Sequence, residues 1–312
     1  MIIYQGSPDT WDPPEGGSAV AIGVFDGVHR GHRRVLAALD EAPVTTKVVL
    51  TFGTHPAQVL STTGAPAKLS TLKERLLLLE EAGIEVAAVL DFDDDMVAMS
   101  PEDFVVDVLV GGLAARFVAV GEGFRFGHGA GGTTETLATL GDDLGFAVAV
   151  VPILHDDGTE IRSTAIRHAV TEGDVEVAAT LLGRPYAIRG IVVPGEGRGA
   201  TIGIPTANVS FPHGLAVPRR GVYAVHAEVD GRSLPAVANL GVRPTFGGDD
   251  QEVLEVHVIG GDLDLRGKEL VVHFVARLRD EQRFDGVDSL VAQIHADIAA
   301  AGGLLGEVPQ TS

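Results

Sequence analysis

Residues 23–32, Gly-Val-Phe-Asp-Gly-Val-His-Arg-Gly-His, combine small residues with two imidazoles and could hold a reacting triphosphate. They follow an apolar run at 19–22 that predicts a buried strand, and they precede a predicted helix at 33–39. Glycines let backbone N–H groups approach an anion, and a helix N-terminus adds partial positive charge. His29 and His32, three positions apart, fall on one side of the first turn.

Two other interpretations fit the same ten residues. A tight turn with one capping side chain needs only glycines and a histidine near a helix start. His29 and His32 could also be two ligands of a metal ion. The metal site is the least favoured, because the chain has no cysteine and Asp26 is the one hard ligand nearby.

Alternating apolar runs and helical patterns in the first half predict an α/β domain. Strands are expected at 46–52, 86–92, 115–121 and 147–151. Helices are expected at 71–82, with Ser70 or Thr71 as the N-cap and Gly83 as the stop, and from Ser100 onward. Continuous apolar strands separated by helices indicate a parallel, doubly wound sheet covered on both faces. Ligands of such sheets bind beyond the carboxyl ends of the strands, where 26–32, 55–56 and 121–132 fall.

The second half has a different pattern. Short strands are expected at 187–193, 221–229 and 254–259, with Gly and Pro between them, and one long helix at 287–301. Strands without intervening helices suggest an antiparallel β-barrel. A helix at 163–182 precedes the change, so we predict one domain over residues 1–183 and another over 184–312.

The net charge and the composition limit the classes of partner that we expect the protein to bind. A formal charge of −20 over 312 residues disfavours attraction to nucleic acid or to anionic lipid. Nucleotide ligands would then require cations concentrated in the pockets, and Arg125, Arg162, Arg167 and Arg279 are candidates. Without cysteines there are no disulfides. No apolar run approaches the roughly 20 residues of a membrane span, and the first residues lack a secretory signal pattern, so a cytoplasmic location is expected.

Nine motifs in register make the chain resemble the bifunctional bacterial riboflavin kinase/FMN adenylyltransferase (FAD synthetase) family. The resemblance covers roughly residues 16 to 298. In the first half the motifs are 23–32, Thr51-Phe52 with His55-Pro56, 69–71 with Arg75, Gly121 with 124–127, and 162–164 with Arg167. In the second half they are 203–208, 238–245, 255–257 and 278–281 with Phe284.

The resemblance implies that the C-terminal domain phosphorylates the ribityl 5′-hydroxyl of riboflavin, using ATP and Mg²⁺ and releasing ADP. Glu255 corresponds to the general base of the family. Thr206 and Asn208 would be Mg²⁺ ligands, since hydroxyl and amide oxygens suit a hard cation. The remaining implied contacts are Gly195, Gly203 and Pro205 for ATP, with Thr206 and Asn208, and Arg243, Pro244, Arg279, Glu281 and Phe284 for the flavin.

The N-terminal domain would transfer AMP from a second ATP to FMN, giving FAD and pyrophosphate. The attacking phosphate is already an anion, so catalysis should come from alignment and charge neutralisation by His29 and His32. The other implied ATP contacts are Gly23, Phe25, Asp26, Ser163, Thr164 and Arg167. The implied flavin contacts are Phe52, His55, Pro56, Phe124 and Arg125. Apoflavoproteins are possible acceptors of the FAD.

The chain departs from the family pattern at a few positions. Gly123 stands where Asp or Asn is usual, Ala200 where Arg is common, Thr54 where Pro is usual, and Arg266 where Tyr is usual. Gly123 supports an alternative, a riboflavin kinase with a weakened adenylyltransferase site. A non-catalytic flavin-binding protein is a second alternative, against which the presence of Glu255, Thr206 and Asn208 argues.

Overall fold

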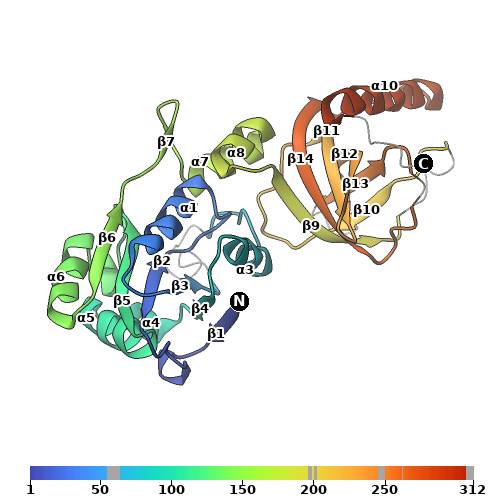
Figure 1. The fold of residues 1–312 in the computed structure, drawn as a ribbon. Coiled ribbons are helices and arrows are strands. Elements are labelled where there is room, and N and C mark those ends of the chain that lie inside the picture. The colour runs from blue at the N-terminus through green and yellow to red at the C-terminus, as the bar shows by residue number, and fades with distance from the viewer. Residues whose placement is uncertain (55–63, 196–198, 200–201, 245–249, 262, 307–312) are drawn as a thin grey trace. The chain divides into compact units, whose positions relative to one another are not determined.

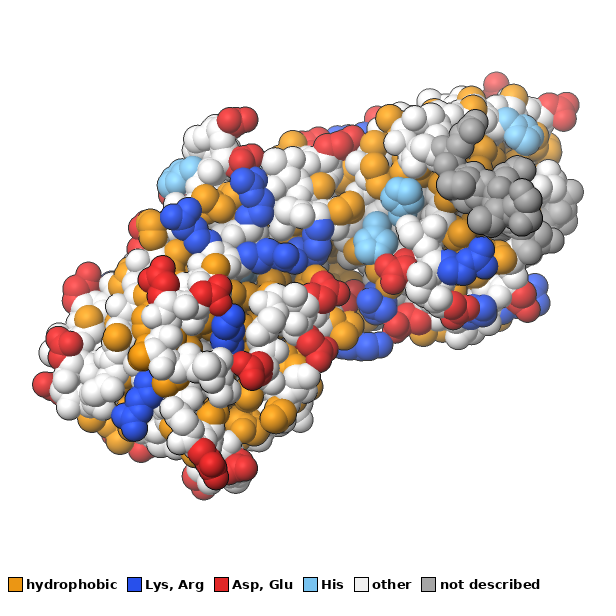
Figure 2. All heavy atoms as spheres, viewed as in Figure 1, with side chains coloured by type: hydrophobic (Ala, Val, Ile, Leu, Met, Phe, Trp, Pro, Cys, Tyr) orange, Lys and Arg blue, Asp and Glu red, His pale blue; other side chains and the backbone are white. Residues whose placement is uncertain are grey.

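A computed structural model describes residues 1–54, 64–195, 199, 202–244, 250–261 and 263–306. The chain forms two compact units, Met1–Ser163 and Thr164–Ser312 (Figure 1). In the described part of the chain, no helix is both long and apolar enough to cross a membrane. Asp and Glu side chains are scattered over the visible face of both units (Figure 2), in keeping with the net charge of −20.

The first unit is built on a six-stranded parallel sheet, which confirms the predicted fold class. Its strands are β1 (Ile2–Gln5), β2 (Ser18–Ile22), β3 (Thr46–Phe52), β4 (Val86–Leu90), β5 (Ala115–Gly121) and β6 (Ala147–Val151). They lie in the order β1-β4-β3-β2-β5-β6. After β2 the chain builds one side of the sheet, β3 and β4, and later the other, β5 and β6. The carboxyl end of β2 is therefore the switch point at which such sheets bind ligands.

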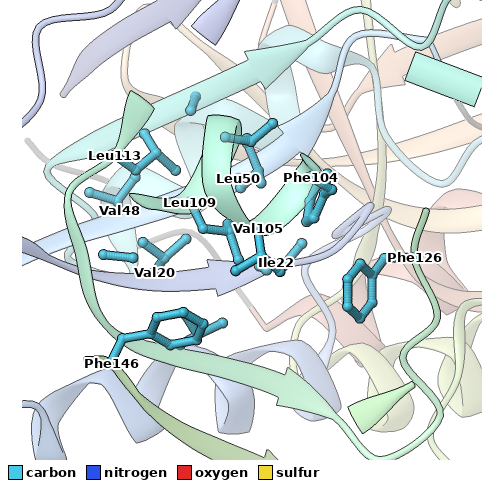
Figure 3. Close-up of a cluster of buried hydrophobic side chains, with 14 of the residues drawn as sticks. Val20, Ile22, Val48, Leu50, Phe104, Val105, Leu109, Leu113, Phe126 and Phe146 are labelled. Atoms are coloured by element: carbon cyan, nitrogen blue, oxygen red, sulfur yellow. The ribbon is translucent and has the colours of Figure 1, made fainter. Parts of the chain in front are cut away.

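Helices cover both faces of this sheet. Helices α1 (Arg30–Ala37) and α3 (Leu72–Glu81) pack on Ala19, Ala21 and Val49. On the other face, η3 (Phe104–Gly112), which winds as a π-helix, and α6 (Thr134–Leu144) cover the cluster drawn in Figure 3, with Val20 and Leu50 against Leu109. Alternate residues of the central strands thus face opposite layers, which is why β2 and β4 are buried at every position.

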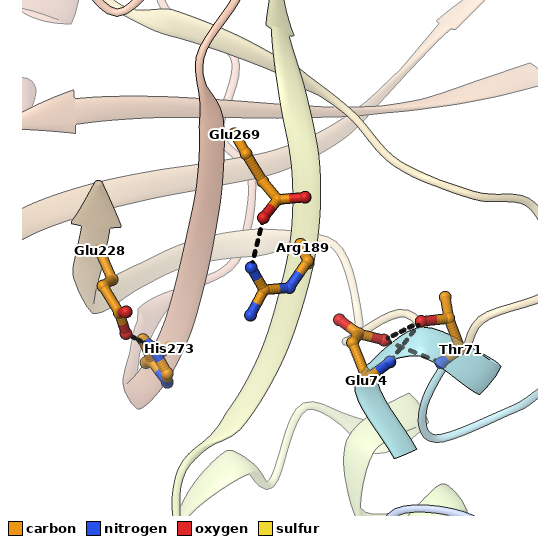
Figure 4. A network of polar contacts seen from close by, with 6 residues as sticks. All are labelled: Thr71, Glu74, Arg189, Glu228, Glu269 and His273. Atoms are coloured by element: carbon orange, nitrogen blue, oxygen red, sulfur yellow. Dashed lines mark hydrogen bonds and ion pairs between the residues drawn. The ribbon is translucent and has the colours of Figure 1, made fainter. Parts of the chain in front are cut away.

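Local sequence signals set the helix ends. Thr71 is the N-cap of α3 and forms a reciprocal capping box with Glu74 (Figure 4): its Oγ1 accepts from the Glu74 N–H at 3.2 Å, and its N–H donates to Glu74 Oε2 at 2.8 Å. Ser100 caps α5 (Pro101–Asp103), and Gly83, with φ +83°, follows α3. These ends confirm the predicted starts and stop.

Short elements complete the first unit. They are η1 (Pro8–Thr10), η2 (Ala38–Glu41), α4 (Asp94–Ala98), η4 (His128–Ala130), β7 (His155–Asp156) and β8 (Thr159–Glu160). Strand β1 was not predicted from the sequence. It is a short edge strand of four residues, whose Ile2 and Ile3 are 59% and 46% exposed. It therefore lacks the longer apolar run by which a buried strand is recognised.

The second unit is a closed antiparallel barrel, as predicted. Its strands are β9 (Tyr186–Val193), β10 (Ala207–Ser210), β11 (Gly221–Val229), β12 (Arg232–Pro244), β13 (Asp250–Val258) and β14 (Glu269–Arg279), in the order β10-β13-β12-β11-β14-β9. Tyr223 and Phe274 fill the interior, with ring centroids 5.3 Å apart. On the outside, an ion pair links β9 to β14 (Arg189–Glu269, 2.6 Å), and a contact between Glu228 and His273 at 3.1 Å links β11 to β14 (Figure 4).

Helix α10 (Val287–Leu305) lies along the outside of the barrel against β11, β12 and β14 (Figure 1). Its Ala301 joins Val222, Ala224 and Val237 in a buried cluster. The barrel thus has an apolar outer face under α10 in addition to its filled interior.

The prediction of one continuous helix over 163–182 is wrong. Two helices, α7 (Ser163–Glu172) and α8 (Val175–Leu182), are separated by Gly173 at φ +85°. A Cβ at this glycine would lie 3.0 Å from both Arg277 Cδ and Tyr223 Oη, so the bend is packed tightly on the barrel. Helix α8 contacts β9 and β14. The domain boundary after residue 183 stays a prediction.

Candidate functional sites

The loop after β2, residues 23–29, lies at the switch point of the sheet and has an unusual backbone. Phe25 and Val28 have φ values of +53° and +37°, and Gly27 has +78°. For residues other than glycine, such conformations cost of order 1–3 kcal/mol each and persist where surrounding contacts enforce them. The loop therefore needs strong anchors.

Asp26 and Arg75 provide those anchors. The buried Asp26 carboxylate accepts from the N–H groups of Leu69 at 2.9 Å and of Ser70 at 3.1 Å, and Ser70 Oγ accepts from the Gly27 N–H at 3.0 Å. Arg75, 4% exposed, donates to the carbonyl of Val24 at 2.7 Å and to two further oxygens at the end of β3. Burial lowers the pKa of Arg75, and the negative charge of Asp26 acts in the opposite direction. These contacts join the loop to β3 and to the start of α3.

The two histidines stack at the start of α1. Buried His29 is the N-cap, and its Nδ1 accepts from the His32 N–H at 3.2 Å. The two rings have centroids 3.5 Å apart and are 19° from parallel, and Phe25 contacts His32 edge to face at 5.2 Å. A neutral imidazole that accepts at Nδ1 carries its proton on Nε2, so Nε2 is the donor atom of the His29 ring. Gly31 leaves room for this ring, because a Cβ there would lie 3.1 Å from it.

Further predicted residues follow the carboxyl ends of neighbouring strands in this unit. Phe52 ends β3. After β5, exposed Arg125 lies between Phe124 and Phe126, whose rings stack at 5.5 Å. Ser163 donates to the Asp26 carbonyl at 3.1 Å. The sheet therefore collects Gly23, Phe25, Asp26, His29, His32, Phe52, Phe124, Arg125 and Ser163 at one edge.

For five of the predicted residues the proposed contacts stay untested. His55 and Pro56 lie outside the described residues. Thr164 and Arg167 lie on α7 in the second unit, with Arg167 Nη1 3.5 Å from Thr164 Oγ1. Their part in triphosphate binding stays a prediction, as does a direct contact of Asp26 with ATP.

In the second unit, a cavity of about 690 Å³ lies between the outer face of the barrel and α10. Glu255 of β13 stands on its wall, directly opposite Asn208 of β10 and Asn239 of β12 in the strand register. Side chains opposite each other in adjacent strands point to the same face. The barrel therefore presents a row of amide, carboxylate and amide to this cavity.

A second cavity of about 480 Å³ meets the first at Gly199, Thr206 and Asn208, which line both. Its walls include apolar Val192, Val256 and Leu265, together with Pro205 and Arg266. Gly195 leaves room for the Asn208 side chain in this orientation, because a Cβ would lie 2.1 Å from Asn208 Nδ2. Gly203, at φ +77°, forms the turn before Thr206. Thr206 and Asn208 thus stand at the boundary between two cavities.

An ion pair connects the β14 side of the larger cavity to α10. Arg279 is paired with buried Asp297, with Nη2 2.8 Å from Oδ2, and Gln293 donates to the same carboxylate at 2.9 Å. The Arg279 guanidinium also lies over the ring of Phe284, 5.8 Å from its centroid. Glu281 lines the cavity next to Gly241, where a Cβ would lie 2.5 Å from its Oε1. Arg243 and Pro244 end β12.

Sequence reasoning missed Asn239, His257 and Asp297 as individual site residues. Asn239 and His257 fell within recognised motifs but had no assigned role. Asp297 had a usable signal: it occupies the apolar stripe of α10, with Leu290, Ile294 and Ala301 at helical spacing. A carboxylate on such a stripe indicates a buried partner.

Family models match both units. A model described as FAD synthetase matches residues 12–165, and one described as riboflavin kinase matches residues 182–305. The fold and these matches define a two-domain protein that joins an FAD synthetase domain to a riboflavin kinase domain.

Curated relatives extend the match over nearly the whole chain. It is 39% identical to the bifunctional riboflavin kinase/FMN adenylyltransferase of Escherichia coli K12, with 98% of both chains covered. The proteins so named from Pseudomonas fluorescens and Bacillus subtilis are each 38% identical, with 94% and 90% of both chains covered. The chain belongs to the bifunctional riboflavin kinase/FMN adenylyltransferase family.

A solved structure supports the fold of the whole chain. A crystal structure described as a macrolide-efflux protein from Streptococcus pneumoniae aligns with a TM-score of 0.88 and 31% identity. The alignment covers 96% of this chain and 99% of that one.

Proposed function

We propose that the two activities of this family are divided between the two units of the chain. The protein is a riboflavin kinase and an FMN adenylyltransferase. The barrel would make FMN from riboflavin and ATP, and the parallel-sheet unit would make FAD and pyrophosphate from FMN and a second ATP. The observation that carries the kinase assignment is the meeting of two cavities at Thr206 and Asn208, with Glu255 opposite Asn208.

For the kinase step, riboflavin would occupy the larger cavity and ATP the smaller one. Glu255 would accept the proton of the ribityl 5′-hydroxyl as its oxygen attacks the γ-phosphate of ATP, and ADP would leave. Asn208 and Asn239 flank the carboxylate and would orient the hydroxyl. Phe284 and the Arg279–Asp297 pair would support the flavin ring from the α10 side.

The residues between the cavities fit a magnesium ion. Thr206 offers a hydroxyl and Asn208 an amide oxygen, and Gly195 leaves open the space next to Asn208. Among the described residues no group of three or more His, Cys, Asp or Glu side chains could hold a metal, so phosphate and water would supply the other ligands, as is usual for Mg²⁺. Mg²⁺ held by Thr206 and Asn208 would add positive charge beside the transferred phosphate.

For the adenylyl step, the phosphate of FMN would attack the α-phosphate of ATP and pyrophosphate would leave. No base is needed, because the attacking oxygen is already an anion. His29 and His32, together with the N-terminus of α1, would neutralise the charge that develops. Because Asp26 and Arg75 anchor the loop at residues 23–29, the loop would not need to rearrange during the reaction.

The direct test uses the whole protein with riboflavin, ATP and Mg²⁺, followed by separation of riboflavin, FMN and FAD. We expect FMN to appear first and FAD to follow. Omitting Mg²⁺ is expected to stop FMN formation, which would support the proposed metal. Protein that leaves riboflavin unchanged would contradict the proposal.

Gly123 tests the strength of the adenylyltransferase site. The residue is exposed, has no left-handed φ, and a Cβ there would meet nothing within 4 Å, so asparagine fits without strain. If the usual side chain contacts flavin or nucleotide, Gly123→Asn is expected to speed conversion of FMN to FAD and to leave FMN formation unchanged. Robust turnover by the parent with no gain in the variant would show that the site is not weakened.

Two fragments test the domain boundary. Residues 182–312 and 164–312 both contain Thr206, Asn208 and Glu255, so both are expected to phosphorylate riboflavin and neither to make FAD. The longer fragment keeps α8, whose Val175, Ala178 and Leu181 are buried. Burial of one Val or Leu side chain contributes about 1.5–3 kcal/mol. We therefore expect the longer fragment to unfold at higher urea concentration. An insoluble 182–312 beside an active 164–312 would place the boundary before residue 182.

A further inference from the structure

His257 makes a contact that the mechanism above does not use. Its Nδ1 lies 2.8 Å from the carbonyl oxygen of Pro205, the residue immediately before Thr206. The half-buried imidazole also lines the larger cavity, on the same strand face as Glu255 two residues earlier. Whether neutral with its proton on Nδ1 or positively charged, the ring can donate this hydrogen bond.

The contact falls where regular strand pairing stops. Strand β10 begins at Ala207, which lies opposite Val256, and Asn208 lies opposite Glu255. One further step of this antiparallel register would bring Thr206 opposite His257, but Thr206 precedes the strand. The His257 side chain therefore continues the link between β13 and the segment before β10 by one residue.

We propose that His257 is a positioning residue of the kinase, which fixes the Pro205–Thr206 peptide and thereby the Thr206 hydroxyl. The inference rests on the proposed role of Thr206 in holding ATP with its Mg²⁺. Thr206 is exposed, and the segment before it reaches back to Gly199 through the Ile204 N–H. The Pro205 carbonyl is part of the peptide that joins Pro205 to Thr206. Because His257 holds this carbonyl, the peptide is less free to rotate.

The role predicts a particular kinetic signature. Without the hydrogen bond, Thr206 would spend less time in the orientation that binds nucleotide, whereas Glu255 and its amide neighbours would remain in place. The KM for MgATP in the kinase reaction should rise about three- to tenfold, the range expected for one neutral hydrogen bond. The kcat should stay within about twofold of the parent.

The experiment compares His257→Phe with His257→Asn in the full-length protein. Phenylalanine keeps a planar ring and has no donor, whereas the amide nitrogen of asparagine lies close to the position of imidazole Nδ1 and can donate to Pro205. We expect the Phe variant to show the raised KM and the Asn variant to recover most of the parental value. His226→Phe, on the outside of β11 and away from both cavities, is the matched control and should leave the KM for MgATP unchanged.

Each result decides the inference. An unchanged KM for MgATP in His257→Phe, or a reduced kcat at constant KM, would overturn it. An equal rise in both His257 variants would also overturn it, because the donor would then not matter. If His257→Phe does not fold, His257→Leu replaces it as the variant without a donor: a raised KM for MgATP there, with a parental value in His257→Asn, supports the inference, and an unchanged KM contradicts it. A parent protein that fails to phosphorylate riboflavin would instead refute the proposed function itself.

Discussion

Replacement of Glu255 by glutamine is expected to lower the rate of FMN formation from riboflavin by about a hundredfold or more, the usual range for losing a general base. Glutamine keeps the size of the side chain and its place between Asn208 and Asn239, so the register of β10, β13 and β12 should persist. What is lost is the ability to accept the hydroxyl proton. The measurement is FMN appearance at saturating riboflavin and MgATP.

The adenylyl reaction provides the internal control for this variant. His29 and His32 lie in the first unit and Glu255 in the second, so FAD formation from added FMN should continue at close to the parental rate. A Glu255→Gln protein that phosphorylates riboflavin at nearly the parental rate would remove Glu255 from the mechanism. Loss of both reactions together would point to a folding defect.

Replacement of His29 by alanine is expected to slow conversion of FMN to FAD by on the order of a hundredfold, the effect of removing one preorganised donor to a developing anion. Alanine also removes the N-cap of α1, which should cost about 1 kcal/mol of unfolding free energy. These two effects have to be separated, since a frayed helix start would itself disturb His32.

The variant His29→Asn separates the loss of the catalytic donor from the loss of the helix cap. Asparagine is among the best N-cap residues, and its oxygen can accept from the N–H of His32 as the imidazole does. We expect the Asn variant to keep parental stability in urea unfolding and to remain as slow as the Ala variant in FAD formation. Recovery of activity in His29→Asn would show that His29 acts only as a helix cap. FMN formation should be unaffected in both variants.

The sequence alone determined most elements with a continuous apolar pattern. Strands β3, β5, β6 and β11 coincide with the predicted ranges, and the start of α10 does too. These strands are rich in Val, Ala and other apolar residues and are bounded by turn residues, so their sequence is recognisable without any knowledge of their neighbours. The capping box of α3 is equally local, because its two partners lie within one turn.

Elements stabilised by distant partners were not recognised. Strand β12 contains Pro235, Gly241 and Pro244, which argue against a strand when only nearby residues are considered. Its pairing with both β11 and β13 outweighs those preferences. The break at Gly173, by contrast, was missed although its signal is local: Gly173 has φ +85°, and the Asp174 N–H donates to the Ala169 carbonyl at 2.9 Å, as at a glycine-terminated helix end.

The same division holds for the sites. The spacing of His29 and His32 at a Gly-rich turn pointed to them directly, whereas Thr206, Asn208 and Glu255 were identified through the resemblance to the family. The tertiary structure decided which of them meet: strand register places Glu255 between Asn208 and Asn239, and α10 brings Asp297 to Arg279. It also shows Asp26 bonded to the backbone of Leu69 and Ser70, more than 40 residues away. Residue type follows from local chemistry, whereas adjacency between distant segments follows from packing and pairing that no single stretch of sequence contains.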